Sequence, residues 1–189
     1  LIIAVLSILS GILYTAGPRP LGYLGLGEIF VLIFFGPVAV AGTYYVQVLE
    51  VNPRMLDPIL AGLGTGFLSM AILVVNNLRD IDSDRRAGKK TLAVHFGRDF
   101  AKGEYAFAVL AASLSPVALY GTTQHGLYSL VAGVVGFLAI PSIYTVFTKA
   151  DGPSLNKVLG YTSLLLIFYS VAFSLGLIYE NHRIRPLSF

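Results

Sequence analysis

Six apolar segments account for most of this chain of 189 residues. The first, Leu1 to Thr15, is shorter than the roughly 20 residues that a membrane-crossing helix needs. The other five cover approximately residues 28–48, 58–78, 105–120, 127–147 and 158–179. The segment 105–120 is short by itself, so we expect its helix to begin earlier and to include Lys102, Gly103 and Glu104. The pattern therefore predicts about five full transmembrane helices plus part of another.

The composition supports an integral membrane protein. Hydrophobic residues make up 56% of the chain, charged residues 12%, and the mean hydropathy is +0.76. Only helices and closed barrels satisfy their backbone hydrogen bonds in lipid, and the apolar runs lack the period-2 alternation of barrel strands. We therefore expect one all-α membrane domain, a multi-span helical bundle, over residues 1–189. The absence of cysteine excludes disulfides and thiolate metal sites.

The basic residues divide unequally between the two sides of such a bundle. Ten fall in one set of alternating connections: Arg19, Arg79, Arg85, Arg86, Lys89, Lys90, Arg98, Lys102, Lys149 and Lys157. The other side holds three: Arg54, Arg183 and Arg185. Connections rich in Lys and Arg face the cytoplasm. The chain is thus predicted to be a multi-pass protein of the cell membrane, with its C-terminus outside.

A cluster of carboxylates follows the apolar run 58–78. Asp80 and Asp84 are four residues apart, so a continuing helix places them on one face, with Asn76 one turn earlier. The C-terminal end of a helix carries partial negative charge, so these carboxylates need cations nearby. Hard oxygen ligands beside anion-binding bases suit Mg²⁺ held together with a diphosphate. The alternative is a loop of mixed charge that only fixes the orientation of the chain.

Neighbouring features have simpler explanations. Gly88-Lys89-Lys90-Thr91 lacks the earlier glycine and the leading strand of a phosphate-binding loop, although its lysines can contact phosphate as point charges. Asp82 points to another helical face and is expected to pair with Arg79 or Arg85. Close packing of helices explains a stagger of glycines at positions 62, 64 and 66.

The connection that contains Arg19 shares the predicted cytoplasmic face with Asp80. Arg19 is therefore either a ligand of the same site or a charge that only sets topology. Tyr14 and Tyr23 border this connection. Tyrosines of membrane proteins commonly lie at the interface, so these two either face substrate or belong to that belt.

Two stretches resemble the UbiA superfamily of membrane prenyltransferases. The run Asn76-Asn77-Leu78-Arg79-Asp80 through Asp84, with Gly88-Lys89 and Thr91-Leu92, is similar to its second aspartate motif, in the version of the 1,4-dihydroxy-2-naphthoate polyprenyltransferase branch. The loop between that family's fourth and fifth helices is similar to Tyr14-Thr15, Gly17, Arg19-Pro20, Gly22-Tyr23 and Gly25-Leu26-Gly27-Glu28.

This resemblance implies an enzyme of menaquinone biosynthesis. Mg²⁺ held by Asp80 and Asp84 would bridge the diphosphate of a polyprenyl donor, and the aromatic acceptor would be 1,4-dihydroxy-2-naphthoate, giving demethylmenaquinone. The implied phosphate-binding residues are Arg19 and Lys89, with Arg79 and Lys90 as further candidates. Asn76 would hydrogen-bond the acceptor or orient Asp80, and Tyr14 and Tyr23 are candidate substrate contacts. The implied partners are these substrates and the lipid bilayer, with no nucleic acid, and the site would be a central cavity open to the cytoplasm.

The chain departs from the family pattern in one respect. The superfamily has nine helices and a first aspartate motif on its second helix, and nothing here matches that motif. We therefore expect this chain to be the C-terminal portion of such an enzyme, containing the last five helices and part of the fourth. The alternatives are another aromatic prenyltransferase of the superfamily, a transporter fragment or a structural membrane subunit. A transporter is disfavoured because its coupling carboxylates usually lie near the membrane midplane.

Overall fold

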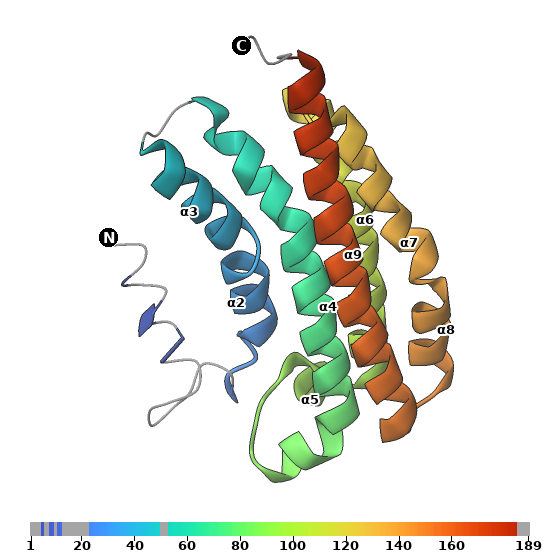
Figure 1. Cartoon of the computed structure of the whole chain (residues 1–189). Helices are drawn as coiled ribbons and strands as arrows, with labels where there is room; N and C mark the ends of the chain where they lie inside the picture. Colours follow the sequence, from blue (N-terminus) through green and yellow to red (C-terminus); the bar gives the residue numbers. More distant parts are fainter. Residues whose placement is uncertain (1–4, 6–7, 10, 13–22, 50–52, 185–189) are drawn as a thin grey trace.

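The computed structural model describes residues 5, 8–9, 11–12, 23–49 and 53–184. From residue 23 onward the regular structure is helical (Figure 1). The elements are α2 (Gly27–Phe34), α3 (Pro37–Val48), η2 (Pro53–Met55), α4 (Leu56–Arg86), α5 (Leu92–Phe96), α6 (Arg98–Thr123), η3 (Leu127–Val134), α7 (Val135–Leu138), α8 (Ile140–Thr148) and α9 (Gly152–Ile184).

Five stretches of helix are long and apolar enough to cross a membrane: Gly27–Val48, Leu56–Arg86, Arg98–Thr123, Leu127–Thr148 and Gly152–Asn181. The predicted all-α, multi-span fold is therefore confirmed, and so is the backward extension of the helix over 105–120, which begins at Arg98. The predicted partial helix over Leu1 to Thr15 lies mostly outside the described residues.

Helix α4 occupies the centre of the bundle and packs against α2, α3, α6 and α9 (Figure 1). Its buried apolar residues recur every three or four positions: Leu68, Ala71, Val74, Val75, Leu78 and Ile81. This spacing gives one continuous apolar stripe along the helix. The facing stripe of α6 consists largely of small residues, including Ala101, Ala108 and Ala112, so the two helices lie close together.

The glycines of α4 let neighbouring helices approach its backbone. The span that begins with α2 breaks at Gly36, just before Pro37 starts α3. A Cβ atom at Gly62 would lie 2.6 Å from the carbonyl carbon of Gly36, so only glycine fits there. At Gly64 a Cβ atom would collide with the side chain of Tyr169 from α9. The prediction that these glycines permit close packing is confirmed.

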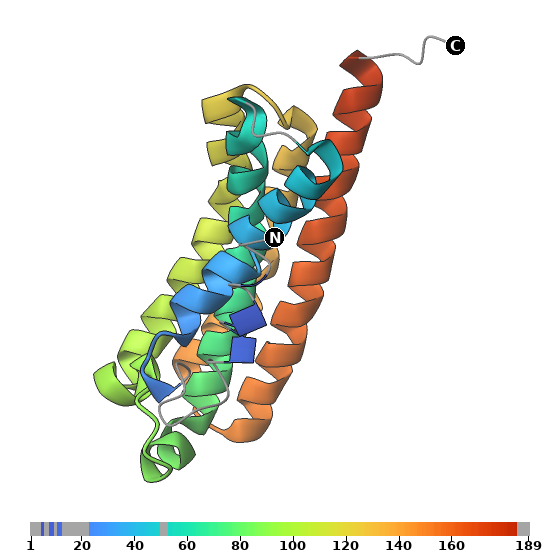
Figure 2. The ribbon, with the colours of Figure 1, turned by 90° about the vertical axis from the view of Figure 1, so that its left-hand side faces the viewer.

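One end of the bundle gathers the polar connections. The C-terminal end of α4, helix α5, the start of α6, the start of α2 and the connection between α8 and α9 all lie at this end (Figure 1). In the view turned by 90°, α9 runs the length of the bundle from this end as one helix (Figure 2). The candidate site residues of α4 therefore meet segments that are far apart in the sequence.

Candidate functional site: a charged cluster at the end of α4

Helix α4 ends in a turn that folds the chain back onto its own last residues. The N–H of Gly88 donates to the carbonyl of Arg85 at 3.2 Å, and the N–H of Lys89 donates to that of Asp84 at 2.9 Å. This pair of bonds defines a Schellman motif, which needs a left-handed residue after the helix. Gly88 supplies it with a φ of +74°. The Gly88-Lys89 pair therefore ends the helix, and Lys89 is directed back toward Asp84.

Asp84 and Lys89 form an ion pair at this turn. The Nζ atom of Lys89 lies 2.8 Å from Oδ1 of Asp84, whose side chain is only 7% exposed. The hydrogen bond to Asp84 raises the pKa of Lys89, and the charge of Asp80 adds to this effect. Lys89 is thus cationic at neutral pH. The expectation that basic residues offset the carboxylates at the end of α4 is confirmed for Asp84.

Asp80 is neutralised by a different cation. The guanidinium of Arg79 donates to both carboxylate oxygens of Asp80, at 2.8 and 2.7 Å. The same group also donates to Oδ1 of Asn76 at 2.7 Å and to Oδ1 of Asn156 from α9 at 2.6 Å. Bidentate pairs of this kind fix geometry as well as charge. Arg79 therefore orients Asp80 and ties α4 to α9, and Asn76 contacts Asp80 through Arg79.

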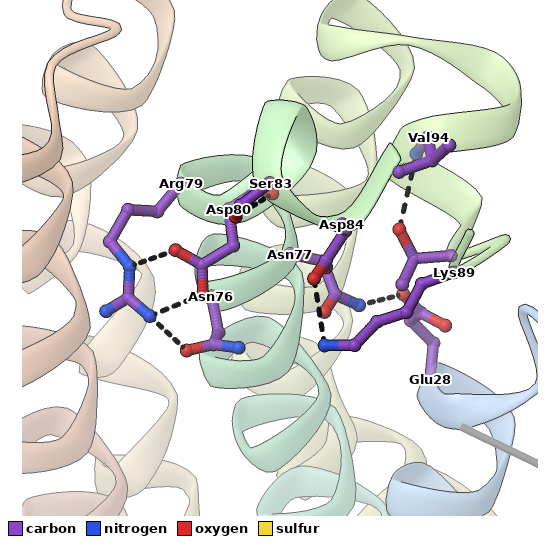
Figure 3. Close-up of polar contacts among 10 residues, drawn as sticks. Glu28, Asn76, Asn77, Arg79, Asp80, Ser83, Asp84, Lys89 and Val94 are labelled. Carbon is purple, nitrogen blue, oxygen red and sulfur yellow. Dashed lines mark hydrogen bonds and ion pairs between the residues drawn. The ribbon is translucent and has the colours of Figure 1, made fainter. Parts of the chain in front are cut away.

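The two ion pairs lie close together at the C-terminal end of α4. Helix α4 continues through both carboxylates, so Asp80 and Asp84 are one turn apart, as the spacing predicted. Figure 3 shows Arg79, Asp80 and Asn76 on the side toward α9, and Asp84 with Lys89 on the side toward α2. Both carboxylates act electrostatically on Lys89, so they belong to one charged cluster.

Sequence reasoning assigned no role to a third carboxylate at this end. Glu28, in the first turn of α2, is 1% exposed, and its Oε1 accepts a 2.7 Å hydrogen bond from Nδ2 of Asn77. Its other oxygen, Oε2, has no hydrogen-bond partner among the described residues. Two features of the sequence could have indicated this contact. Glu28 is an acidic residue at the start of an apolar run, and the acidic motif contains a second asparagine, Asn77. Figure 3 shows this contact between α2 and α4.

The loop before α2 also reaches the cluster. The N–H of Lys90 donates to the carbonyl of Tyr23 at 2.9 Å, and Nζ of Lys89 lies 5.6 Å from the centre of the Tyr23 ring. Gly25 has a φ of +73°, and a Cβ atom there would lie 2.8 Å from the carbonyl oxygen of Lys90. The structure thus brings Tyr23, Lys89 and Lys90 together. The other two residues predicted from this connection, Tyr14 and Arg19, lie outside the described residues.

The predicted partner of Asp82 is wrong. Its Oδ2 lies 2.7 Å from Nη2 of Arg98 at the start of α6, and not beside Arg79 or Arg85 as expected. Arg79 is engaged with Asp80, and the short α5 segment brings Arg98 back to the end of α4. Asp82 is 61% exposed, so it lies apart from the buried carboxylate of Asp84.

The cluster offers part of a divalent-metal site. Asp80 and Asp84 provide carboxylate oxygens one turn apart, which suit a hard cation. Within residues 23–49 and 53–184, no group of three or more acidic or histidine side chains is close enough to hold a metal alone. Two carboxylates with cations and amides around them fit Mg²⁺ that takes its remaining ligands from phosphate and water.

Comparison with known proteins shows the family of this chain. The model of the UbiA prenyltransferase family matches residues 1–171. The chain is 36% identical over 177 residues to 1,4-dihydroxy-2-naphthoate octaprenyltransferase of Haemophilus influenzae, covering 93% of this chain and 56% of that protein. The Mycobacterium tuberculosis protein of the same name is 40% identical over 160 residues, which is 85% of this chain and 53% of the relative.

A third relative has a different name. The 2-carboxy-1,4-naphthoquinone phytyltransferase of Synechocystis is 34% identical over 120 residues, covering 63% of this chain and 37% of the relative. No solved structure matches the chain. The chain spans about half the length of the octaprenyltransferases it matches, at 56% and 53% of the two named here.

Proposed function

Because this chain belongs to the UbiA prenyltransferase family, we propose that the protein containing it transfers a polyprenyl group to an aromatic acceptor in the membrane. The relatives named above are called octaprenyl- or phytyltransferases, and each name gives a naphthalene derivative as acceptor. We propose 1,4-dihydroxy-2-naphthoate as the acceptor and demethylmenaquinone, formed in its reduced quinol state, as the product, which places the reaction in menaquinone biosynthesis.

The pairing of two carboxylates with two cations at the end of one helix carries this proposal. A prenyl diphosphate needs both a divalent ion and cationic side chains, because it is a polyanion on an apolar tail. Asp80 and Asp84 supply the first requirement, and Arg79 and Lys89 supply the second within 2.8 Å of these carboxylates. The surrounding helices span a membrane, which accommodates the tail.

Asp80 and Asp84 are the residues proposed to hold Mg²⁺, which when bound supplies Lewis-acid stabilisation to the leaving diphosphate. Arg79, Lys89 and Lys90 are proposed to act on the same negative charge as it builds up, and Arg19 is proposed as a further cation for it. Groups placed where charge develops stabilise the transition state. The allylic C–O bond breaks, and its electron pair leaves with the diphosphate.

The remaining proposed roles concern the acceptor. An electron-rich ring carbon of the naphthoate attacks the allylic cation, and the ring loses its carboxylate as CO₂. Asn76 holds the guanidinium that orients Asp80, so it is proposed as a positioning residue. Tyr23 and Tyr14 are proposed to border the substrate, and the predicted central cavity would open beside them. The loop charges favour a cytoplasmic position for this end of the bundle.

The proposal is tested with the complete protein reconstituted in liposomes. Radiolabelled prenyl diphosphate is supplied with 1,4-dihydroxy-2-naphthoate, and in a parallel reaction with 4-hydroxybenzoate, at saturating Mg²⁺. We expect a prenylated, decarboxylated naphthoquinol and release of CO₂ from the carboxyl-labelled acceptor. Transfer to 4-hydroxybenzoate alone would keep the family assignment and overturn the acceptor. Ion flux without any transfer would overturn the enzyme proposal.

A further inference from the structure

A groove lies between α8 and the first turns of α9, at the end of the bundle that also carries the charged cluster (Figure 1). The groove is open on one side and has a volume of about 460 Å³. Helix α8 lines it with Tyr144 and Thr148, one turn apart, and α9 lines it with Ser154, Lys157 and Tyr161 at the same kind of spacing. Both helices thus turn one polar and aromatic stripe into the groove.

The mouth of the groove carries net positive charge. Lys149 and Lys157 both line it and are both exposed. In the part of the chain that the structure describes, neither forms an ion pair, although the carboxylate of Asp151 lies near Lys149. Asp151 accepts the N–H of Ser154 at 2.9 Å and so caps the start of α9. This hydrogen bond from the backbone of Ser154 is the main reason why the pKa of Asp151 is lowered. Two lysines therefore face one carboxylate that is already engaged.

The same two helical faces become apolar toward the middle of the membrane. Beyond Tyr161 the stripe of α9 continues through Leu164 and Phe168, which are 62% and 42% exposed. Beyond Tyr144 the other wall continues through Ile140 of α8 and Phe137 of α7, which are 57% and 75% exposed. A cationic mouth that leads into exposed apolar walls matches a molecule with an anionic head and hydrocarbon chains.

This groove is distinct from the charged cluster at the end of α4. Asn156 turns toward α4, where its amide oxygen accepts from Arg79. Its neighbour Lys157 lies about 100° further around α9, since a helix turns by that angle per residue, and lines the groove instead. Helix α9 therefore separates the two basic sites.

We propose that this groove binds the headgroup of an anionic phospholipid, such as phosphatidylglycerol, with its acyl chains along α8 and α9. Lys149 and Lys157 contact the phosphate, and the tyrosines lie at the level of the headgroup, where such rings are common. Basic pockets between transmembrane helices on the cytoplasmic side are suited to anionic lipid headgroups. The proposal is independent of the transferase activity.

The test counts lipids bound to the complete protein. Protein purified in detergent is mixed with equal amounts of phosphatidylglycerol and phosphatidylcholine, and the lipids retained are identified by native mass spectrometry. We expect the wild type to retain phosphatidylglycerol preferentially. Lys149→Gln and Lys157→Gln should each lower the phosphatidylglycerol to phosphatidylcholine ratio by about fivefold, because each basic residue near a membrane surface contributes about that factor. Thr148→Phe fills the groove without changing charge and should also lower the ratio.

Lys102→Gln is the matched control. Lys102 lies in α6, has its Nζ 3.1 Å from Asp99, and loses the same charge outside the groove. An equal fall in the ratio for this control would show an effect of total charge and overturn the proposal. A wild type with no preference for phosphatidylglycerol would also overturn it.

Inorganic pyrophosphate with Mg²⁺ should leave the retained lipid in place. Its displacement would assign the groove to the substrate site instead. Each variant is first checked for an unchanged melting temperature in phosphatidylcholine, and Thr148→Phe keeps the test decisive if a lysine variant is unstable.

Discussion

Lys89 and Asp84 are joined twice: Nζ lies 2.8 Å from Oδ1, and the amide of Lys89 donates to the carbonyl of Asp84 at 2.9 Å. The backbone bond belongs to the turn that ends α4, so the position of the ammonium follows from the end of the helix. A cation is thereby fixed beside the proposed metal ligand before any substrate binds.

Asp80→Ala or Asp84→Ala in the complete protein should abolish measurable prenyl transfer. Losing one group that stabilises the departing charge costs about 10²–10³ in rate, or roughly 3–4 kcal/mol. Expression and membrane insertion should change little, because these carboxylates serve a polar end of the bundle and not its apolar core. Product formation from radiolabelled prenyl diphosphate at saturating Mg²⁺ measures the effect.

Asp82→Ala is the matched control for these variants. Its carboxylate is 61% exposed and pairs with Arg98, so its loss should leave most of the activity. An inactive Asp82→Ala beside an active Asp80→Ala would show that the metal site has been placed on the wrong residues.

Gly88→Val should destabilise the protein by about 1–2 kcal/mol, the cost of a left-handed conformation for a residue with a side chain. A Cβ atom at Gly88 would meet nothing within 4 Å, so the backbone strain is the whole effect. Gly88→Asn should be milder, because asparagine tolerates this conformation. Thermal unfolding in detergent compares the two variants. Equal melting temperatures for Val, Asn and wild type would rule out a capping role for Gly88.

The membrane helices and the spacing of Asp80 and Asp84 could be predicted because both depend on residues near in sequence. Apolar runs of sufficient length define the spans, and four residues make one turn. The contacts between helices could not be predicted in this way. Asn77 and Glu28 are 49 positions apart, and Arg79 and Asn156 are 77 apart.

The prediction for the partner of Asp82 was wrong for the same reason, because the true partner lies on another helix. Helical spacing alone favours cations close in sequence, such as Arg85. Arg98 reaches Asp82 only because α5 reverses the chain. Helical periodicity shows which residues share a face, but it does not show which face of the next helix they meet.

Gly62→Ala should destabilise the bundle by about 1–3 kcal/mol, the range for an overpacked interior. The added methyl group would meet backbone atoms of Gly36 and Pro37 at 2.6–2.8 Å, and backbone cannot rotate away as a side chain can. Gly42→Ala in α3 is the control, because its Cβ would meet nothing within 4 Å. The melting temperature should fall for Gly62→Ala only. A fall for both variants would point to a general intolerance of alanine in these helices.

Lys89→Gln should have opposite effects on two ligands of the complete protein. Lys89 neutralises Asp84, so its removal should tighten binding of Mg²⁺ alone, by about two- to fivefold for a partly exposed pair. The same substitution removes a cation from the diphosphate, so pyrophosphate measured at saturating Mg²⁺ should bind more weakly. Calorimetric titration with each ligand gives both affinities.

Lys90→Gln is the control, since Lys90 contacts Tyr23 through its backbone and its side chain is exposed. It should leave the affinity for Mg²⁺ alone unchanged. Weaker binding of Mg²⁺ alone to Lys89→Gln would contradict this prediction, because it would mean that Lys89 supports the metal site and does not compete with Mg²⁺ for Asp84.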